Sequence, residues 1–138
     1  MKFVSLFSGI ESCSQAWVGP LAWEPLAYAE IDPFACHVLA HRHGASRPAR
    51  MPDPSAPGLT DEESRERAAA ISAVSGLLEV ARVPNVGDMR QHDWSEYRGI
   101  CDLLVGGPPC QAFSIAGLRN SLSDARGNLS LEYVRAIR

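Results

Sequence analysis

Short apolar runs, separated by segments of helical periodicity, recur along the whole chain. Residues 3–7, 26–29 and 102–107 have the length and flanking residues typical of buried strands, and residues 85–89 end a further short strand or loop. Residues 108–127 predict an irregular segment, which leads into a helix that runs to the end of the chain. Strands that alternate with helices favour an α/β domain with a mainly parallel sheet.

Helix signals follow each of the first two predicted strands. The first helix runs through Trp17 and ends at Gly19-Pro20, which is a normal stop signal. The second helix is predicted to begin after Asp32, whose side chain can cap it, and to end near Gly44. The fixed backbone angle of Pro33 suits the first position of that helix.

The middle of the chain has a different character. Residues 46–58 are rich in proline and lack periodicity, which predicts a loop. Thr60 and Glu63 have the spacing of a capping box, and apolar residues at helical spacing predict a helix over residues 60–82. Residues 46–83 therefore look like an insertion between two strand units.

The composition fits one globular domain over residues 1–138. Hydrophobic residues make up 46% and charged residues 21%, which excludes a disordered tail, a collagen-like repeat and a coiled coil. No apolar run approaches the ~18 residues of a membrane span, so we expect no membrane partner and a cytoplasmic location. The net charge of −3 argues mildly against a self-sufficient nucleic-acid binder.

The four cysteines are spaced too irregularly for a zinc ribbon or a redox motif. Cys13, Cys36 and Cys101 are expected to pack as small apolar residues. His37 and His41 lie one helical turn apart, but no third ligand accompanies them, so no metal site is predicted.

Unusual residues follow several predicted strands, at the ends where parallel α/β sheets bind ligands. Gly9 permits close approach of a ligand, and Glu30 follows it by 21 residues, the separation typical of a ribose-binding carboxylate. Asp88 can accept a hydrogen bond from an adenine amino group. Singly these signals are weak, because Glu30 is equally a solvated strand end and Asp88 a turn residue.

Residues 106–111, Gly-Gly-Pro-Pro-Cys-Gln, carry a stronger signal. Two glycines followed by two prolines cannot continue a strand or begin an ordinary helix, so the chain must turn in a stiff shape. Such a turn presents Cys110 at the surface, whereas the alternative is a small buried core residue.

Residues 106–114, GGPPCQAFS, closely resemble the nucleophile motif of DNA (cytosine-5)-methyltransferases. Other segments look like the three S-adenosylmethionine motifs of that family and the segment after its catalytic loop: residues 6–10, 30–32, 87–89 and 126–129. They keep the family's order and leave out only residues 46–83. The resemblance implies a Rossmann-like, S-adenosylmethionine-dependent methyltransferase fold, of which this chain would form an incomplete, N-terminal half.

The resemblance also implies a role for each motif residue. Phe7 and Ile31 would cover the two faces of the adenine of S-adenosylmethionine, Glu30 would hold the ribose hydroxyls, and Asp88 would bind the adenine amino group. The complete set of implied cofactor-binding residues is Phe7, Ser8, Gly9, Ile10, Glu30, Ile31, Asp88, Met89, Pro109 and Leu129.

The chemistry implied by the resemblance requires a cysteine. Carbon 5 of cytosine is a poor nucleophile, so the Cys110 thiolate would first add to carbon 6 of the base. The substrate would be DNA, whose target base must leave the duplex, as in bacterial or phage modification systems. Residues of a mobile loop would contact that DNA: Gln111, Ser114, Arg119 and Asn120.

Two departures from the family pattern change these expectations. Glu11 and Ser12 stand where family members usually carry glycines, so the first loop is expected to approach the cofactor less closely. The sequence also ends at Arg138, whereas the family continues with a Glu-Asn-Val strand and a target-recognition domain. We therefore expect the chain to be inactive unless a second polypeptide supplies these parts. The alternative is a non-catalytic nucleoside-binding or interaction module, or a remnant of such an enzyme.

Overall fold

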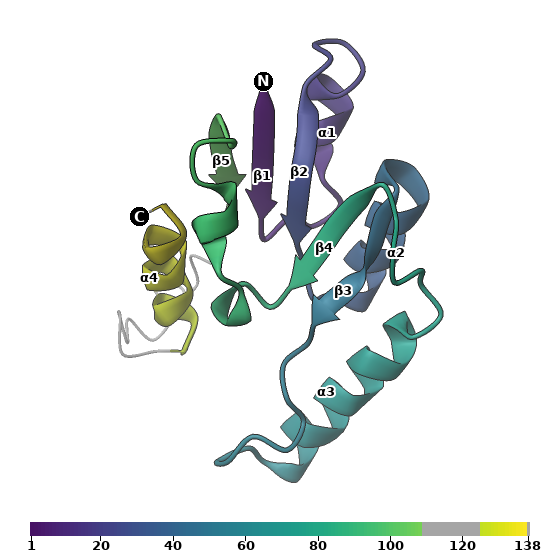
Figure 1. The fold of residues 1–138 in the computed structure, drawn as a ribbon. Helices are drawn as coiled ribbons and strands as arrows, with labels where there is room; N and C mark the ends of the chain where they lie inside the picture. Colours follow the sequence, from purple (N-terminus) through teal and green to yellow (C-terminus); the bar gives the residue numbers. More distant parts are fainter. Residues whose placement is uncertain (109–124, 138) are drawn as a thin grey trace, which may run out of the picture.

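The computed structural model describes residues 1–108 and 125–137, and in them five strands form one parallel sheet (Figure 1). The strands are β1 (Lys2–Leu6), β2 (Glu24–Ala29), β3 (Ala45–Arg50), β4 (Val83–Gly87) and β5 (Leu103–Gly106). Their order across the sheet is β3-β4-β2-β1-β5, and every neighbouring pair is parallel. This architecture confirms the predicted α/β class and is consistent with a Rossmann-like methyltransferase fold.

The strand order places a topological switch point beside β1. From β1 the chain first builds the sheet toward β2, β4 and β3, and it then returns to place β5 on the other side of β1. Ligands of open parallel sheets bind outside the carboxyl ends of the strands at such a point. The segments that follow β1 and β5 therefore occupy the position where this fold binds its ligands.

Helices cover both faces of the sheet. The helical elements are α1 (Ser12–Trp17), α2 (Pro33–His43), α3 (Asp61–Val74), the 3-10 turns η1 (Met89–Gln91) and η2 (Trp94–Tyr97), and α4 (Ala125–Ile137). On one face, Trp17 of α1 and Leu39 of α2 pack in a cluster with Phe3. On the other, Trp94 of η2 packs with Val4, and α4 lies beside the same cluster.

The predicted helix ends are confirmed for α2 and at the start of α3. Asp32 Oδ1 accepts a hydrogen bond from Ala35 N at 2.9 Å, and Gly44 follows α2 with a φ of +66°. Thr60 Oγ1 accepts from Glu63 N at 3.2 Å, while the Glu63 carboxylate accepts from Thr60 N at 2.8 Å. The backbone N–H groups of Thr60 and Glu63, which have no partner within the helix, are thereby hydrogen-bonded as in a capping box.

The prediction of a loop over residues 46–58 is wrong for its first residues. Residues 46–50 belong to β3, which pairs with β4 at the edge of the sheet. Proline has no amide hydrogen and is confined to edge strands, and this explains why Pro48 is compatible with a strand there. Residues 46–83 thus supply an edge strand and α3; that they are an insertion stays a prediction.

Two other predicted boundaries differ from the structure. The helix predicted to reach residue 82 ends at Val74, two residues before Gly76, and Leu78 is 72% exposed instead of facing a helix-packed core. Glycine is a poor helix former, so the chain leaves the helix before it. At the other end, α4 begins at Ala125, inside the segment that was predicted to be irregular.

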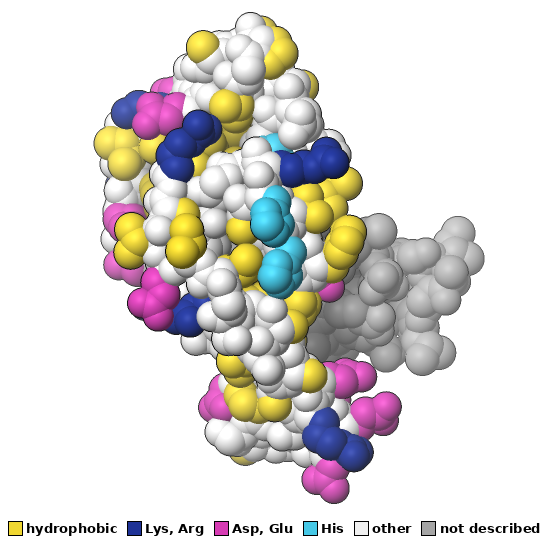
Figure 2. All heavy atoms as spheres, turned by 90° about the vertical axis from the view of Figure 1, so that its right-hand side faces the viewer, with side chains coloured by type: hydrophobic (Ala, Val, Ile, Leu, Met, Phe, Trp, Pro, Cys, Tyr) yellow, Lys and Arg dark blue, Asp and Glu magenta, His cyan; other side chains and the backbone are white. Residues whose placement is uncertain are grey.

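His37 and His41 of α2 contact each other, and His37 also lies against α3. His37 Nε2 lies 3.0 Å from Ala73 O, and the His37 ring stacks on the His41 ring with centroids 6.4 Å apart. Figure 2 shows histidine side chains next to each other on the molecular face that it presents. Among the described residues no group of three or more metal-ligating side chains occurs. Cys36 is buried and burial raises its thiol pKa to about 12. None of the helices in the described ranges has the length and apolarity needed to cross a membrane.

Candidate active site

Gly106, the first residue of the Gly-Gly-Pro-Pro-Cys segment, ends β5 directly beside the end of β1. Leu6 and Gly106 are register partners at the carboxyl ends of β1 and β5. A Cβ atom on Gly106 would lie 2.3 Å from Leu6 O, so only glycine allows this approach of the two backbones. The predicted residues that follow in this segment lie outside the described residues: Pro109, Cys110, Gln111, Ser114, Arg119 and Asn120.

The turn after β1 is held in an uncommon backbone conformation. Phe7, Gly9 and Glu11 have φ angles of 52°, 55° and 57°, in the left-handed region that costs a non-glycine residue about 1–2 kcal/mol. The Ser8 hydroxyl fixes the turn, because it donates to Ser5 O at 2.8 Å and accepts from Ala29 N at 3.3 Å. A Cβ on Gly9 would have no atom within 4 Å, so the space beside it is open to a ligand, and Ile10 is 54% exposed.

Glu30 joins the turn after β1 to the end of β2. Its Oε2 accepts a hydrogen bond from Gly9 N at 2.7 Å, and its Oε1 accepts from Ile31 N and Asp32 N, both at 2.8 Å. The two predicted motifs, 21 residues apart in sequence, are therefore in direct contact. A carboxylate has about four acceptor positions, so three backbone donors leave room for one more, such as a ribose hydroxyl.

Asn85 is a positioning residue that the sequence analysis missed. Its Oδ1 accepts from Glu30 N at 3.1 Å and from Gly87 N at 3.0 Å, while its Nδ2 donates to Glu30 O at 3.2 Å. The side chain is buried, and Asn85 N donates to Ser46 Oγ. Asparagine is depleted in strands. An asparagine within the otherwise apolar strand Val83–Gly87 was therefore the signal in the sequence that could have indicated a positioning residue here.

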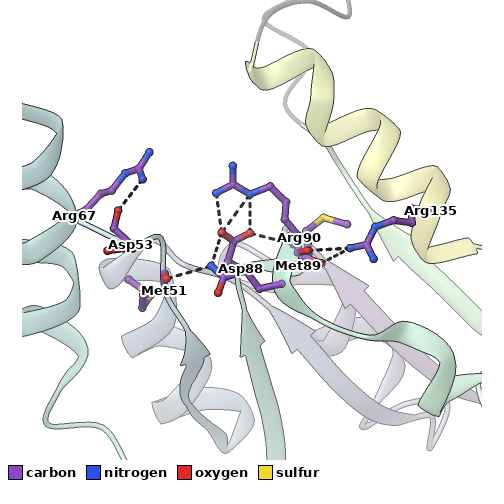
Figure 3. Close-up of polar contacts among 8 residues, drawn as sticks. Met51, Asp53, Arg67, Asp88, Met89, Arg90 and Arg135 are labelled. Atoms are coloured by element: carbon purple, nitrogen blue, oxygen red, sulfur yellow. Dashed lines mark hydrogen bonds and ion pairs between the residues drawn. The ribbon is translucent and has the colours of Figure 1, made fainter. Parts of the chain in front are cut away.

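Asp88 follows β4 and is almost completely buried, at 4% exposure. Its carboxylate forms a two-pronged ion pair with the Arg90 guanidinium, with Nε to Oδ1 at 2.9 Å and Nη2 to Oδ2 at 2.7 Å (Figure 3). Burial alone would raise the pKa of the Asp88 carboxyl, but the hydrogen bonds and charge of Arg90 outweigh it and hold that pKa below its usual value. Asp88 is thus an ionised acceptor that already has a cationic partner.

Met89 and Leu129, two further residues of the predicted site, lie in the described part of the chain. Met89 is buried in the core cluster beside Trp94, and its carbonyl accepts from Trp94 Nε1 and from Arg135 Nη2, both at 3.2 Å. Arg135 therefore fastens α4 to the turn after β4. Leu129, near the start of α4, is half-buried.

Glu11, the departure from the glycine-rich pattern, points into the protein. It is 3% exposed, and its carboxylate accepts from Ser5 Oγ at 2.6 Å and from Ser14 Oγ at 3.2 Å. The extra carboxylate is therefore used to tie α1 to β1, and the open space beside Gly9 is kept.

Three of the predicted residues lie in one row along the carboxyl edge of the sheet. Asp88, Glu30 and Phe7 directly follow the neighbouring strands β4, β2 and β1, and β5 ends beside β1. A cleft of about 450 Å³ between η2, β5 and α4 lies elsewhere, because Asp93, Cys101 and Ile137 line it and none of the described predicted residues does. The strand ends, and not this cleft, therefore form the candidate site.

A parallel sheet with a glycine turn at its switch point and a carboxylate after the adjacent strand is typical of α/β domains that bind nucleosides. Residues 79–138, which include β4, β5 and the Pro-Pro-Cys segment, match the family model described as C-5 cytosine-specific DNA methylase. The chain is also similar to type II methyltransferases: it is 50% identical to M.Eco47II of Escherichia coli over 36% of this chain and 57% identical to M.AquIA of Picosynechococcus over 27%. These findings support the predicted resemblance to the C-5 cytosine DNA methylase family, whose model matches residues 79–138 of this chain.

A longer similarity links the chain to a phage protein. Over 94% of this chain it is 38% identical to the DNA N-6-adenine-methyltransferase of Escherichia phage P1. Because the alignment covers 130 of the 138 residues, it includes most of residues 46–83. The chain spans only 13% of the phage protein, 12% of M.Eco47II and 15% of M.AquIA.

Proposed function

We propose that this chain carries the cofactor- and nucleophile-bearing part of a DNA (cytosine-5)-methyltransferase, with S-adenosylmethionine as the methyl donor and DNA as the substrate. The observation that carries the proposal is the register of β1 and β5. It sets the Gly106-Gly107-Pro108 turn, from which Cys110 follows, beside the Phe7–Gly9 turn, to which Glu30 is hydrogen-bonded. A cofactor turn and a nucleophile segment at one switch point are what methyl transfer between two bound substrates requires.

The described residues fit the proposed cofactor. The open space beside Gly9 admits a ligand close to the backbone, and the Glu30 carboxylate retains an acceptor position for a ribose hydroxyl. When bound, S-adenosylmethionine supplies an electrophilic methyl group on a sulfonium. Phe7 and Ile31 would cover the adenine, and Asp88 would bind its amino group. Ser8, Ile10, Met89, Pro109 and Leu129 would complete the site.

The proposed role of Cys110 follows from the weak nucleophilicity of the cytosine ring. The thiolate would add to carbon 6 and turn the carbon 5–carbon 6 double bond into an enamine that is nucleophilic at carbon 5. The methyl group would come from the S-adenosylmethionine sulfonium, whose sulfur–methyl bond breaks and whose sulfur leaves as a neutral thioether. A base then removes the carbon 5 proton, and the electrons of that bond re-form the carbon 5–carbon 6 double bond and expel the thiolate. The ring thereby exchanges one proton for one methyl group. Gln111, Ser114, Arg119 and Asn120 are proposed to contact the DNA, whose target base must leave the duplex.

Methylation of adenine N6 is the second candidate, because the phage P1 relative carries that name. An exocyclic amine attacks a methyl group with its own lone pair and needs no covalent thiolate. The Pro-Pro-Cys segment, which lies within the matched residues 79–138, therefore favours cytosine carbon 5. The phage protein is far longer than the region aligned with this chain, so its name does not assign adenine methylation to that region.

We further propose that methylation of DNA requires protein segments beyond these 138 residues, for example a second polypeptide, and that the reaction takes place in the cytoplasm of a bacterium. The relatives named here come from bacteria and their phages, and this chain covers only a small share of each. Base recognition and proton donation to the ring would come from those segments.

The test combines S-adenosylmethionine binding with product analysis. Calorimetry is expected to show that the purified chain binds S-adenosylmethionine and that Glu30→Gln weakens the binding, with Glu62→Gln, a variant of an exposed α3 carboxylate, as the matched control. Glu30→Gln removes a charge but keeps a carbonyl acceptor. Absence of binding, or N6-methyladenine as the product in DNA, would contradict the proposal. Formation of 5-methylcytosine by this chain alone, lost in Cys110→Ser, would support the cytosine assignment and refute the need for other segments.

A further inference from the structure

We propose that Arg90 is a specificity-determining residue of the adenine subsite: its guanidinium occupies the Asp88 carboxylate and must leave before a 6-amino purine can bind there. This inference rests on the proposed function, in which Asp88 binds the adenine amino group. It concerns which nucleosides the site accepts and how tightly.

The acceptor positions of Asp88 are already filled. Oδ1 accepts from Arg90 N at 3.1 Å and Arg90 Nε at 2.9 Å, while Oδ2 accepts from Arg90 Nη2 at 2.7 Å and Gln91 Nε2 at 3.2 Å. A carboxylate offers about four such positions. The adenine amino group is a donor, so it can bind to Asp88 only by displacing one of these partners.

The guanidinium is the partner that can leave. Arg90 N is part of the backbone of η1, where Gln91 N donates to Asp88 O at 3.0 Å. Gln91 Nε2 is also held by Met51 O at 3.3 Å. The Arg90 side chain is 43% exposed, while that of Asp88 is 4% exposed. Figure 3 shows the guanidinium on the outward side of the Asp88 carboxylate.

A second carboxylate lies within electrostatic reach of the displaced guanidinium. The hydrogen bond and charge of Asp88 and, more weakly, the charge of Glu132 raise the pKa of Arg90. Glu132 lies on α4, and Arg135 of the same helix donates to the carbonyls of Met89 and Arg90, both at 3.2 Å. The Glu132 carboxylate is already ion-paired with Arg135 Nε, so a displaced Arg90 guanidinium would be attracted by a carboxylate that has a partner of its own.

The two positions of the guanidinium favour different purines. With Arg90 on Asp88 the subsite presents N–H donors, which suit the 6-oxo group of inosine. With Arg90 displaced the subsite presents a carboxylate, which suits the 6-amino group of adenosine. Purine riboside has only hydrogen at position 6 and requires neither arrangement, so it reports on the rest of the site.

The experiment is calorimetric titration of adenosine, inosine and purine riboside into the wild-type chain and Arg90→Met. Methionine keeps much of the side-chain length without the charge, and Arg65→Met on α3, whose Nε donates to Asp61 O, is the control. We expect Arg90→Met to raise the adenosine-to-inosine affinity ratio by at least about fivefold, a value below the full worth of a charge-assisted hydrogen bond. Purine riboside and the control variant are expected to show little change.

A measurement on the wild-type chain keeps the test independent of folding of the variant. The nitrogen-15 NMR resonance of Arg90 Nε is expected to shift on binding adenosine and not on binding purine riboside. An unchanged or lower adenosine-to-inosine ratio in folded Arg90→Met, or an unmoved Arg90 resonance with adenosine bound, would overturn the inference and leave the proposed function standing. Failure of every nucleoside and of S-adenosylmethionine to bind would overturn both.

Discussion

The substitution Gly106→Ala tests how closely β5, which leads into the nucleophile segment, packs against β1. An added Cβ would lie 2.3 Å from Leu6 O and 3.0 Å from Tyr133 Cε2, whereas real Cβ contacts do not fall below 3.0 Å. Accommodation would therefore move β5 from β1 by at least about 0.7 Å and disturb the last pairing of the two strands. Overpacking of this kind costs about 1–3 kcal/mol.

The matched control is the next residue, because a Cβ on Gly107 would meet no atom within 4 Å. We expect Gly106→Ala to lower the free energy of unfolding by about 2–3 kcal/mol, or roughly 6–12 °C in Tm for a chain of this size. Gly107→Ala is expected to stay within about 1 kcal/mol of wild type, since alanine also restricts the unfolded chain. Urea and thermal unfolding followed by circular dichroism give both values. Equal effects of the two substitutions would refute the described register of β1 and β5.

Three further predictions concern the supports of the site. Asn85→Ala removes the partners of Glu30 N, Gly87 N and Glu30 O, and urea unfolding should show a loss of about 2–4 kcal/mol; a loss below about 1 kcal/mol would contradict the bridge. Because the pKa of Asp88 is lowered in the folded state, its ionised form stabilises the fold above the ordinary carboxyl pKa. The difference in unfolding free energy between wild type and Asp88→Asn should therefore be constant near neutral pH and shrink below about pH 4, and a difference that grows on acidification would show the opposite sign. Thr60→Ala should cost about 1 kcal/mol by loss of the α3 cap, while Thr60→Ser should be nearly neutral; equal stabilities of the two variants in urea would argue against the cap.

The sequence predicted the parallel α/β architecture because its signals were local. Apolar runs define β1, β2 and β5, and Asp32-Pro33 and Thr60/Glu63 are short-range capping patterns that act within one helical turn. The contact between Gly9 and Glu30 was also within reach, because the 21-residue separation belongs to a known supersecondary arrangement.

What the sequence analysis missed depends on contacts between distant residues. β3 is a strand because its backbone pairs with β4, which overrides the loop signal of its prolines. Asn85 binds Glu30, which lies 55 positions away in the sequence. The ion pair of Arg90 with Asp88 depends on the conformation of the Arg90 side chain, which the sequence spacing does not predict. Glu11, predicted to change the cofactor loop, was instead turned inward by two serine hydroxyls.

The central claim is that Cys110 is the activated nucleophile of a methyltransferase site, and the reactivity of its thiol across pH tests this most directly. Peptide mass spectrometry after brief alkylation gives a separate rate for each of the four cysteines of the chain. Cys36 is the internal reference for an inert thiol, because burial raises its pKa to about 12. We predict that Cys110 alone reacts with a midpoint below the ordinary thiol pKa of about 8.5. A Cys110 that reacts no more readily than Cys13 and Cys101 would contradict the account.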